Sequence, residues 1–126
     1  MAFIKYNPNP LGASVGDCTV RAISLARGMT WEEVYTDLCE QGFKMADMPS
    51  SNSVWGLYLK NKGYRYSVIP DSCPFCYTVR DFCRDHPTGV YILGTGTHVI
   101  CVIDGDYIDT WDSGEQIPLF SYTKEV

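Results

Sequence analysis

The stretch VGDCTVRAI, residues 15–23, places a cysteine between a glycine turn and the start of an apolar run with helical spacing. The backbone N–H groups in the first turn of a helix have no intrahelical partner, and the aligned peptide dipoles leave roughly half a positive charge there. A helix N-terminus or a neighbouring imidazolium can lower the pKa of a thiol from ~8.5 into the range of about 3.5–7.5. We therefore interpret Cys18 as a candidate nucleophile, for which the rest of the chain must supply a base and a group that orients the base.

The length and composition indicate one domain over residues 1–126. The 126 residues are 45% hydrophobic and 20% charged, which allows a single core but not two ordinary domains. The formal net charge of −5 argues against nucleic acid and anionic membranes as partners, because both attract basic patches. No apolar run has the length of a signal peptide or of a membrane span of ~20 residues, so we expect a cytoplasmic protein. Nothing in the sequence indicates the oligomeric state.

The six cysteines are expected to be mainly free thiols, because disulfides rarely persist in a reducing compartment. The alternative is a structural zinc site formed by Cys73, Cys76, Cys83 and His86. Zinc sites more often join two tight ligand pairs through a longer insert, and Cys83 and His86 also fit the apolar stripe of a short helix. We therefore expect neither a metal nor a cofactor.

Helix signals dominate the first half of the chain, after an extended lead-in at residues 6–12. Three helices are expected here: residues 18–27 ended by Gly28, a second opened by the capping box Thr30-Trp31-Glu32-Glu33, and a third from Ser50 or Ser51 to Gly63. Residues 42–49 have no clear period and are expected to form a loop.

Strand signals dominate the second half. A strand over residues 64–69 and a short helix over residues 78–85 precede three strands, at residues 90–93, 98–103 and 107–112. Together these patterns predict an α+β fold, in which a helical half led by the Cys18 helix packs on a C-terminal antiparallel sheet.

The predicted hairpin around residues 104–106 brings a histidine and a carboxylate together. If the loop comprises all three residues, His98 faces Asp112 across the strands, with Cβ atoms about 4.5–5.5 Å apart. At that distance an aspartate can accept the imidazole N–H and hold the other ring nitrogen toward a thiol. A loop of two residues would shift the partner, and Asp109, which alternation places on the other face, is the second choice.

The order Cys18, His98, Asp112 resembles that of the papain-like cysteine peptidase superfamily. In that superfamily a cysteine opens the central helix and meets a histidine and an aspartate or asparagine on a following antiparallel sheet. The chain looks in particular like small papain-like proteins of Firmicutes and their phages. The shared motifs are Asn-Pro-Asn-Pro at residues 7–10, Gly-Asp-Cys at 16–18, the MPSSNSVWG segment at 48–56 and Asp-Thr-Trp-Asp-Ser-Gly at 109–114. The resemblance spans nearly the whole chain and implies a papain-like fold and a catalytic triad.

The chain departs from papain at the site of the oxyanion donor. Papain has a glutamine six residues before the nucleophile, where this chain has Gly12. Asn9 is our candidate for a second donor beside the Cys18 N–H, with Asn7 as the alternative, although both asparagines could simply shape the turn. A carboxylate aimed at the sulfur would raise the thiol pKa, so we expect Asp17 to turn away and cap the helix.

The expected reaction is hydrolysis of a peptide or amide substrate through a thioester. Peptide or isopeptide hydrolysis is the first choice, while amidase and acyltransferase chemistry would use the same groups. The alternative is a papain-like domain without turnover, or a zinc-stabilised interaction module of a phage or its host. Trp55, Tyr58 and Trp111 are candidates for lining a substrate cleft, although the first two also fit the buried side of a helix.

Overall fold

The computed structural model describes residues 2–124. The helices in this range are α1 (Cys18–Arg27), α2 (Trp31–Met45), α3 (Asn52–Asn61) and α4 (Val79–Asp85). The strands are β1 (Phe3–Lys5), β2 (Tyr64–Val68), β3 (Val90–Gly94), β4 (Val99–Ile103), β5 (Asp106–Asp109) and β6 (Phe120–Lys124). The structure is thus mixed, as an α+β fold requires. Within the described range, no helix combines the length and the apolar character needed to cross a membrane.

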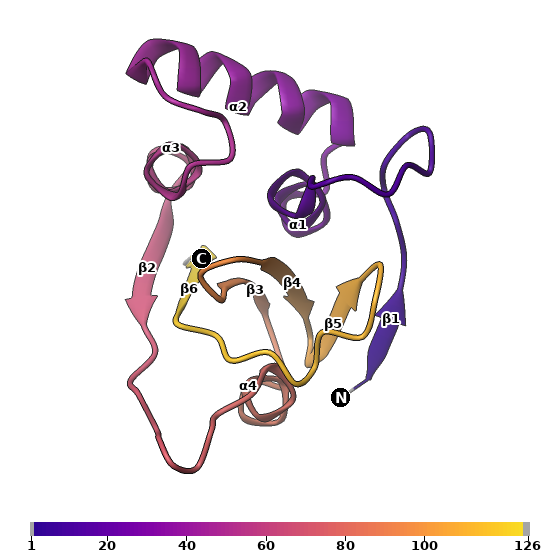
Figure 1. Cartoon of the computed structure of the whole chain (residues 1–126), viewed down its shortest axis with the longest axis vertical. Helices are drawn as coiled ribbons and strands as arrows, with labels where there is room; N and C mark the ends of the chain where they lie inside the picture. The colour runs from indigo at the N-terminus through magenta and orange to yellow at the C-terminus, as the bar shows by residue number, and fades with distance from the viewer. Residues whose placement is uncertain (1, 125–126) are drawn as a thin grey trace.

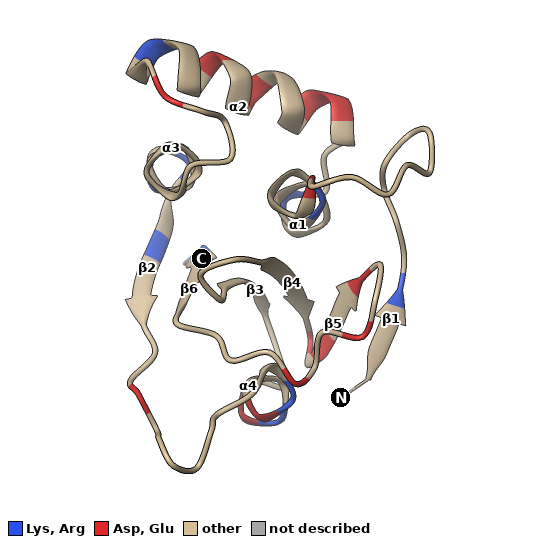
Figure 2. Ribbon diagram, in the orientation of Figure 1, with Lys and Arg blue, Asp and Glu red and all other residues tan. Residues whose placement is uncertain are grey.

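All six strands form one sheet, in the order β1-β5-β4-β3-β6-β2. Helices α1 and α3 pack on one face of this sheet, α2 lies outside them, and α4 covers the opposite face (Figure 1). Figure 2 shows acidic positions along α2 and at both ends of β5. Part of the negative net charge therefore lies on the outermost helix.

The sequence predicts an antiparallel sheet, but the observed sheet is mixed. Strand β1 runs parallel to β5 at one edge, with Ile4 opposite Ile108. Neither β1 nor β6 follows from the sequence patterns. Strand β1 has only three residues, too few to display an alternation of apolar and polar side chains.

The β4–β5 hairpin has a register different from the predicted one. Val102 pairs with Tyr107, and Ile103 pairs with Asp106, so the loop contains only Asp104 and Gly105. Both loop residues have positive φ, 48° and 79°. Asp-Gly with positive φ at both positions is typical of the type I′ turn, whose twist matches that of the flanking strands. The prediction of a three-residue loop is therefore wrong, and each predicted pair of residues across the two strands shifts by one residue.

The predicted helix boundaries hold at several ends. Helix α1 covers residues 18–27, and Gly28 follows in the left-handed conformation with φ 64°. The capping box of α2 forms between Thr30 and Glu33. However, α2 continues to Met45 through part of the expected loop. The chain can return close to the end of this helix because residue 42 is a glycine. A Cβ at that position would lie only 2.6 Å from the Asp47 carbonyl oxygen and would clash with it.

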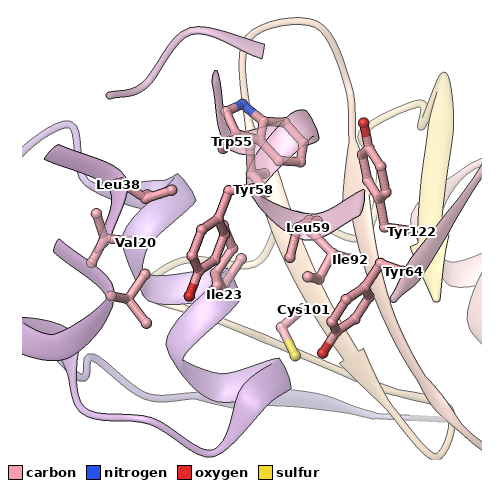
Figure 3. Packing of buried hydrophobic residues seen from close by; sticks show 13 residues of the cluster. Val20, Ile23, Leu38, Trp55, Tyr58, Leu59, Tyr64, Ile92, Cys101 and Tyr122 are labelled. Atoms are coloured by element: carbon pink, nitrogen blue, oxygen red, sulfur yellow. The ribbon is translucent and has the colours of Figure 1, made fainter. Parts of the chain in front are cut away.

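Two apolar clusters hold the layers together. The larger one lies between the helices α1, α2 and α3 and the sheet, with Ile23, Leu59 and Ile92 fully buried. Figure 3 shows side chains from these helices and from the sheet converging in it. The smaller cluster joins α4 to the opposite face, around Phe82 and Val102. Packing on both faces therefore fixes β4, the strand that follows His98.

Candidate active site

Cys18 is the first residue of α1 and is partly buried. The apolar side of α1, including Ala22 and Ile23, is buried against the sheet and α2. This packing fixes the start of the helix beside the strand that follows His98. The predicted position of the thiol at a helix N-terminus is confirmed, and the first-turn N–H groups and the helix dipole act on it there.

His98 lies directly before β4 and meets Cys18. A tight turn holds it, in which the Thr95 N–H donates to the His98 carbonyl at 2.9 Å. The imidazole lines the same hollows as the Cys18 thiol and lowers the pKa of that thiol, while its Nε2 lies 2.6 Å from Asp109 Oδ2. Because Nε2 serves the carboxylate, Nδ1 is the ring nitrogen left for the sulfur. The structure therefore brings the predicted cysteine and histidine together.

Asp112 is not the carboxylate that contacts His98. Its Oδ1 accepts from the Tyr107 hydroxyl at 2.6 Å, and its Oδ2 pairs with Arg80 at 3.0 Å. The carboxylate on His98 belongs to Asp109, the second choice from the sequence. The predicted contact between His98 and Asp112 is thus a mistake that follows from the wrong loop length.

Asp109 reaches His98 because both residues lie where the ladder between their strands has stopped. The pairing of β4 with β5 ends at Cys101 and Ile108, so strict alternation does not apply to these side chains. The carboxylate is held from further sides: the Ser113 hydroxyl donates to Oδ2 at 2.7 Å, and the Thr110 N–H donates to Oδ1 at 2.8 Å. Asp109 is 4% exposed, so little water competes for these hydrogen bonds.

The contacts move the pKa values of the two reactive groups in opposite directions. Burial alone raises the pKa of Cys18, but hydrogen bonds from His98 and the Val99 N–H, with the positive charges of His98 and Arg21, lower it overall. Burial alone lowers the pKa of His98, whereas the hydrogen bonds and charges of Asp109 and Cys18 raise it to about 9. This pattern favours transfer of the thiol proton to the imidazole.

The buried thiols of Cys83 and Cys101 have different surroundings from Cys18. Burial raises the pKa of Cys83 to about 11 and that of Cys101 to about 12. Cys73 and Cys76 are exposed, and Cys83 is buried. Among the residues described, no group of three or more His, Cys, Asp or Glu side chains is arranged to hold a metal ion. The alternative zinc site of Cys73, Cys76, Cys83 and His86 is therefore not assembled.

Two hollows meet at the Cys18–His98 pair. One, of about 270 Å³, lies toward α3 and β6 and is lined by residues including Trp55, Asn52 and Phe120. The other, of about 260 Å³, lies toward the lead-in loop and is lined by residues including Asn7 and Trp111. Both tryptophans proposed for a cleft therefore line one.

The aromatic candidates differ in their surroundings. Trp111 is 45% exposed, and its ring centroid lies 4.9 Å from that of His98. Trp55 is almost fully buried and packs on Phe120 and Tyr122. Tyr58 lies elsewhere, lining a different hollow beside α2. Trp111 is thus the tryptophan that covers the imidazole directly.

The candidate oxyanion donors are engaged in the lead-in loop. Asn9 accepts from the Leu11 N–H and donates its amide to Asp17 at 3.0 Å, and Asn7 donates to the Ala13 carbonyl at 3.2 Å. Asp17 makes no capping bond, contrary to expectation. Its carboxylate instead turns inward, toward Arg21 and the Trp31 indole N–H. The asparagines therefore shape the loop, as the plainer interpretation expects.

Sequence reasoning missed the side chains behind the reactive pair. Arg21 is buried between two carboxylates, paired with Asp17 and 3.5 Å from Asp109. Ser113, fully buried, holds Asp109. Arg21 lies one helical turn after Cys18, and this spacing was the one sequence signal that could have placed Arg21 near the thiol. An arginine in a helix is ordinarily exposed, so the spacing alone pointed to the surface.

Fold and geometry together define a class: a mixed α/β domain with a cysteine–histidine–aspartate cluster where a helix N-terminus meets a sheet. No protein-family model, curated protein or solved structure matches the chain. The chemistry of the site therefore has to be argued from its own residues.

Proposed function

We propose that this protein is a papain-like cysteine hydrolase of peptide or amide bonds. Cys18 would be its nucleophile, His98 its general acid and base, and Asp109 the group that orients His98. The single observation that supports this most is the series Cys18–His98–Asp109 at the start of a helix, in which His98 is hydrogen-bonded to Asp109 and lines the same hollows as Cys18. It combines an activated thiol, a base with one nitrogen facing that thiol, and a buried carboxylate that selects the tautomer.

The arrangement of elements supports the papain-like part of the proposal. The nucleophile opens a helix packed on a sheet, and the base precedes a strand of that sheet. This is the relation that the sequence resemblance implies. The parallel edge strand β1 adds to that relation without altering it.

In the acylation step, the Cys18 thiolate attacks the carbonyl carbon of the substrate. A carbon–sulfur bond forms, and the carbonyl electron pair moves to oxygen, next to the Cys18 N–H at the helix N-terminus. The tetrahedral intermediate then collapses as its carbon–nitrogen bond breaks. The leaving nitrogen takes the proton from His98 Nδ1 and departs as an amine, which leaves a thioester and a neutral imidazole.

In the deacylation step, neutral His98 takes a proton from water, and the resulting hydroxide attacks the thioester carbon. The second tetrahedral intermediate collapses with cleavage of the carbon–sulfur bond. The products are a carboxylic acid and the starting thiolate–imidazolium pair. Asp109 stabilises the imidazolium in both steps and is not itself protonated.

The hollows on both sides of Cys18 favour a chain-like substrate. Each could receive a side chain next to the scissile bond, one toward α3 and one toward the lead-in loop. Besides Cys18, His98 and Arg21, no residue that lines either hollow within residues 2–124 carries an ionisable side chain. We therefore expect uncharged residues on either side of the cleaved bond.

Alkylation kinetics test the activated thiol without knowledge of the substrate. Iodoacetamide at neutral pH should label Cys18 faster than the exposed Cys73 and Cys76, with labelled positions assigned by peptide mass spectrometry. His98→Gln should abolish this selectivity, while His86→Gln, which changes the other histidine of the chain, should preserve it. Equal labelling of Cys18 in both variants would refute the proposal.

Turnover is tested with a peptide library of defined sequences, digested by wild-type protein and by Cys18→Ala. Peptides cut by the wild type and left intact by Cys18→Ala would support hydrolysis. A selectively reactive Cys18 that cleaves no peptide or amide in the library would instead favour a domain that binds without turnover.

A further inference from the structure

A buried arginine connects the reactive cluster to a second carboxylate. Arg21 is 7% exposed, pairs with Asp17 through one end of its guanidinium, and lies 3.5 Å from Asp109 Oδ1 through the other. Both carboxylates are as buried as the arginine. With His98 and Cys18, these groups form a series of contacts along which the charges alternate in sign from Asp17 to the thiolate.

We infer that Arg21 is a positioning residue, which holds Asp109 toward His98 and favours the thiolate of Cys18 at neutral pH. The inference depends on the proposed function and adds a residue to its machinery. Asp109 Oδ2 is occupied by His98 and Ser113, whereas Oδ1 faces Arg21 and the Thr110 N–H. With partners on both oxygens, the carboxylate is held in the orientation that the imidazole needs.

The charge of Arg21 also offsets an unfavourable neighbour of the nucleophile. Asp17 directly precedes Cys18, and its negative charge opposes formation of a thiolate. Arg21 pairs with this carboxylate, and the Trp31 indole N–H and the Asn9 amide donate to its other oxygen at 2.9 and 3.0 Å. Without Arg21, the buried carboxylates of Asp17 and Asp109 would lose their shared counter-charge.

Stability alone does not account for this arrangement. Replacing buried ion pairs by apolar residues of similar volume is often neutral or stabilising. Arg21 also lines the hollow that contains Cys18, His98 and Trp111, so its charge lies at the edge of the site. The ionisable groups near the thiol, in the part of the chain that is described, are Asp17 directly before α1, Arg21 from α1, His98 before β4 and Asp109 from β5.

The first test compares the pH dependence of Cys18 alkylation by iodoacetamide in three proteins. Arg21→Met removes the charge and keeps most of the volume, so labelling at about pH 5.5 should be roughly three- to tenfold slower than in the wild type. The difference should shrink toward about pH 9, where the thiol ionises without help. Arg21→Lys restores the charge and should recover most of the rate.

Two further variants separate electrostatics from structure. Asp17→Asn removes a negative charge beside the sulfur and should move the acid limb of the profile to lower pH, opposite to Arg21→Met. Arg27→Met removes an arginine from the far end of α1, where it bonds to the Tyr58 hydroxyl, and should leave the profile unchanged. A loss of packing would slow labelling in both site variants rather than shift it in opposite directions.

The inference is overturned if the Arg21→Met profile coincides with that of the wild type, or is slower by one factor at every pH. Circular dichroism of each variant establishes whether it is folded. If Arg21→Met does not fold, the decision falls to Asp17→Asn, whose unshifted profile would overturn the inference. A failed His98→Gln comparison would remove the proposed function instead, so the two failures are distinguishable.

Discussion

Exchanging one carboxylate at a time should reveal which aspartate serves His98. Burial by itself lowers the pKa of His98, yet Asp109 and Cys18 raise it from 6.5 to about 9. That rise corresponds to about 3 kcal/mol in favour of the imidazolium. If Asp109 supplies half or more of it, Asp109→Asn should lower the pKa of His98 by about one to two units. Asp112→Asn should leave it unchanged, because Asp112 bonds to Tyr107 and Arg80.

The chain suits this measurement because it contains two histidines. Their ring resonances can be followed by NMR through a pH titration and assigned with His86→Gln. Asparagine keeps an oxygen that can accept from Nε2, so the variant removes charge with little change of shape. A His98 pKa that is unchanged in Asp109→Asn, or that falls equally in Asp112→Asn, would refute the assignment of Asp109.

Other perturbations test the energetics around the site. The raised pKa of His98 stabilises the fold below about pH 6.5, and this contribution is lost as the pH rises through about 9. The lowered pKa of Cys18 acts in the opposite direction, because it makes the free energy of unfolding rise with pH above the pKa of Cys18 in the folded state. In urea titrations of Cys18→Ala, the free energy of unfolding should therefore decrease by at most ~3 kcal/mol as the pH rises from about 6.5 to about 9. The wild type should change less over the same range. Trp111→Ala should lower the pKa of His98 by less than one unit, since a cation–π contact is worth about 0.5–1 kcal/mol. An unchanged NMR titration would show that the tilted Trp111 ring has no such role. Gly94→Ala places a methyl group against the Phe120 ring and should destabilise the fold by ~1–3 kcal/mol, unless urea unfolding shows that the ring moves aside freely.

The local signals of the sequence predicted much of the helical half. A glycine after residue 27 and the Thr30–Glu33 box are short-range features, and both appear in the structure as expected. The candidate nucleophile and base were proposed in the same way, from a turn before a helix and a histidine at the start of a predicted strand. Such features depend on neighbours within a few residues, which a sequence displays directly.

The choice of the carboxylate that contacts His98 depended instead on the number of residues assumed for the hairpin loop. Asp104-Gly105-Asp106 could close a loop of two or three residues, and one residue decides which aspartate faces His98. The contact of Asp109 also lies beyond the regular ladder, where alternation gives no guidance. Arg21 was hidden for another reason. Its burial follows from two carboxylates, one of them 88 positions away, and only the folded chain brings them together.

The turn formed by Asp104 and Gly105 limits which changes of length the sequence can accept during evolution. Surface hairpin turns usually tolerate inserted residues, but one added here would slide β5 along β4 and carry Asp109 off the imidazole. A turn at the opposite end of the strand from the sulfur would thus govern the proposed activity through its length alone. Among active homologues, we expect this turn to vary in its residues far more readily than in their number.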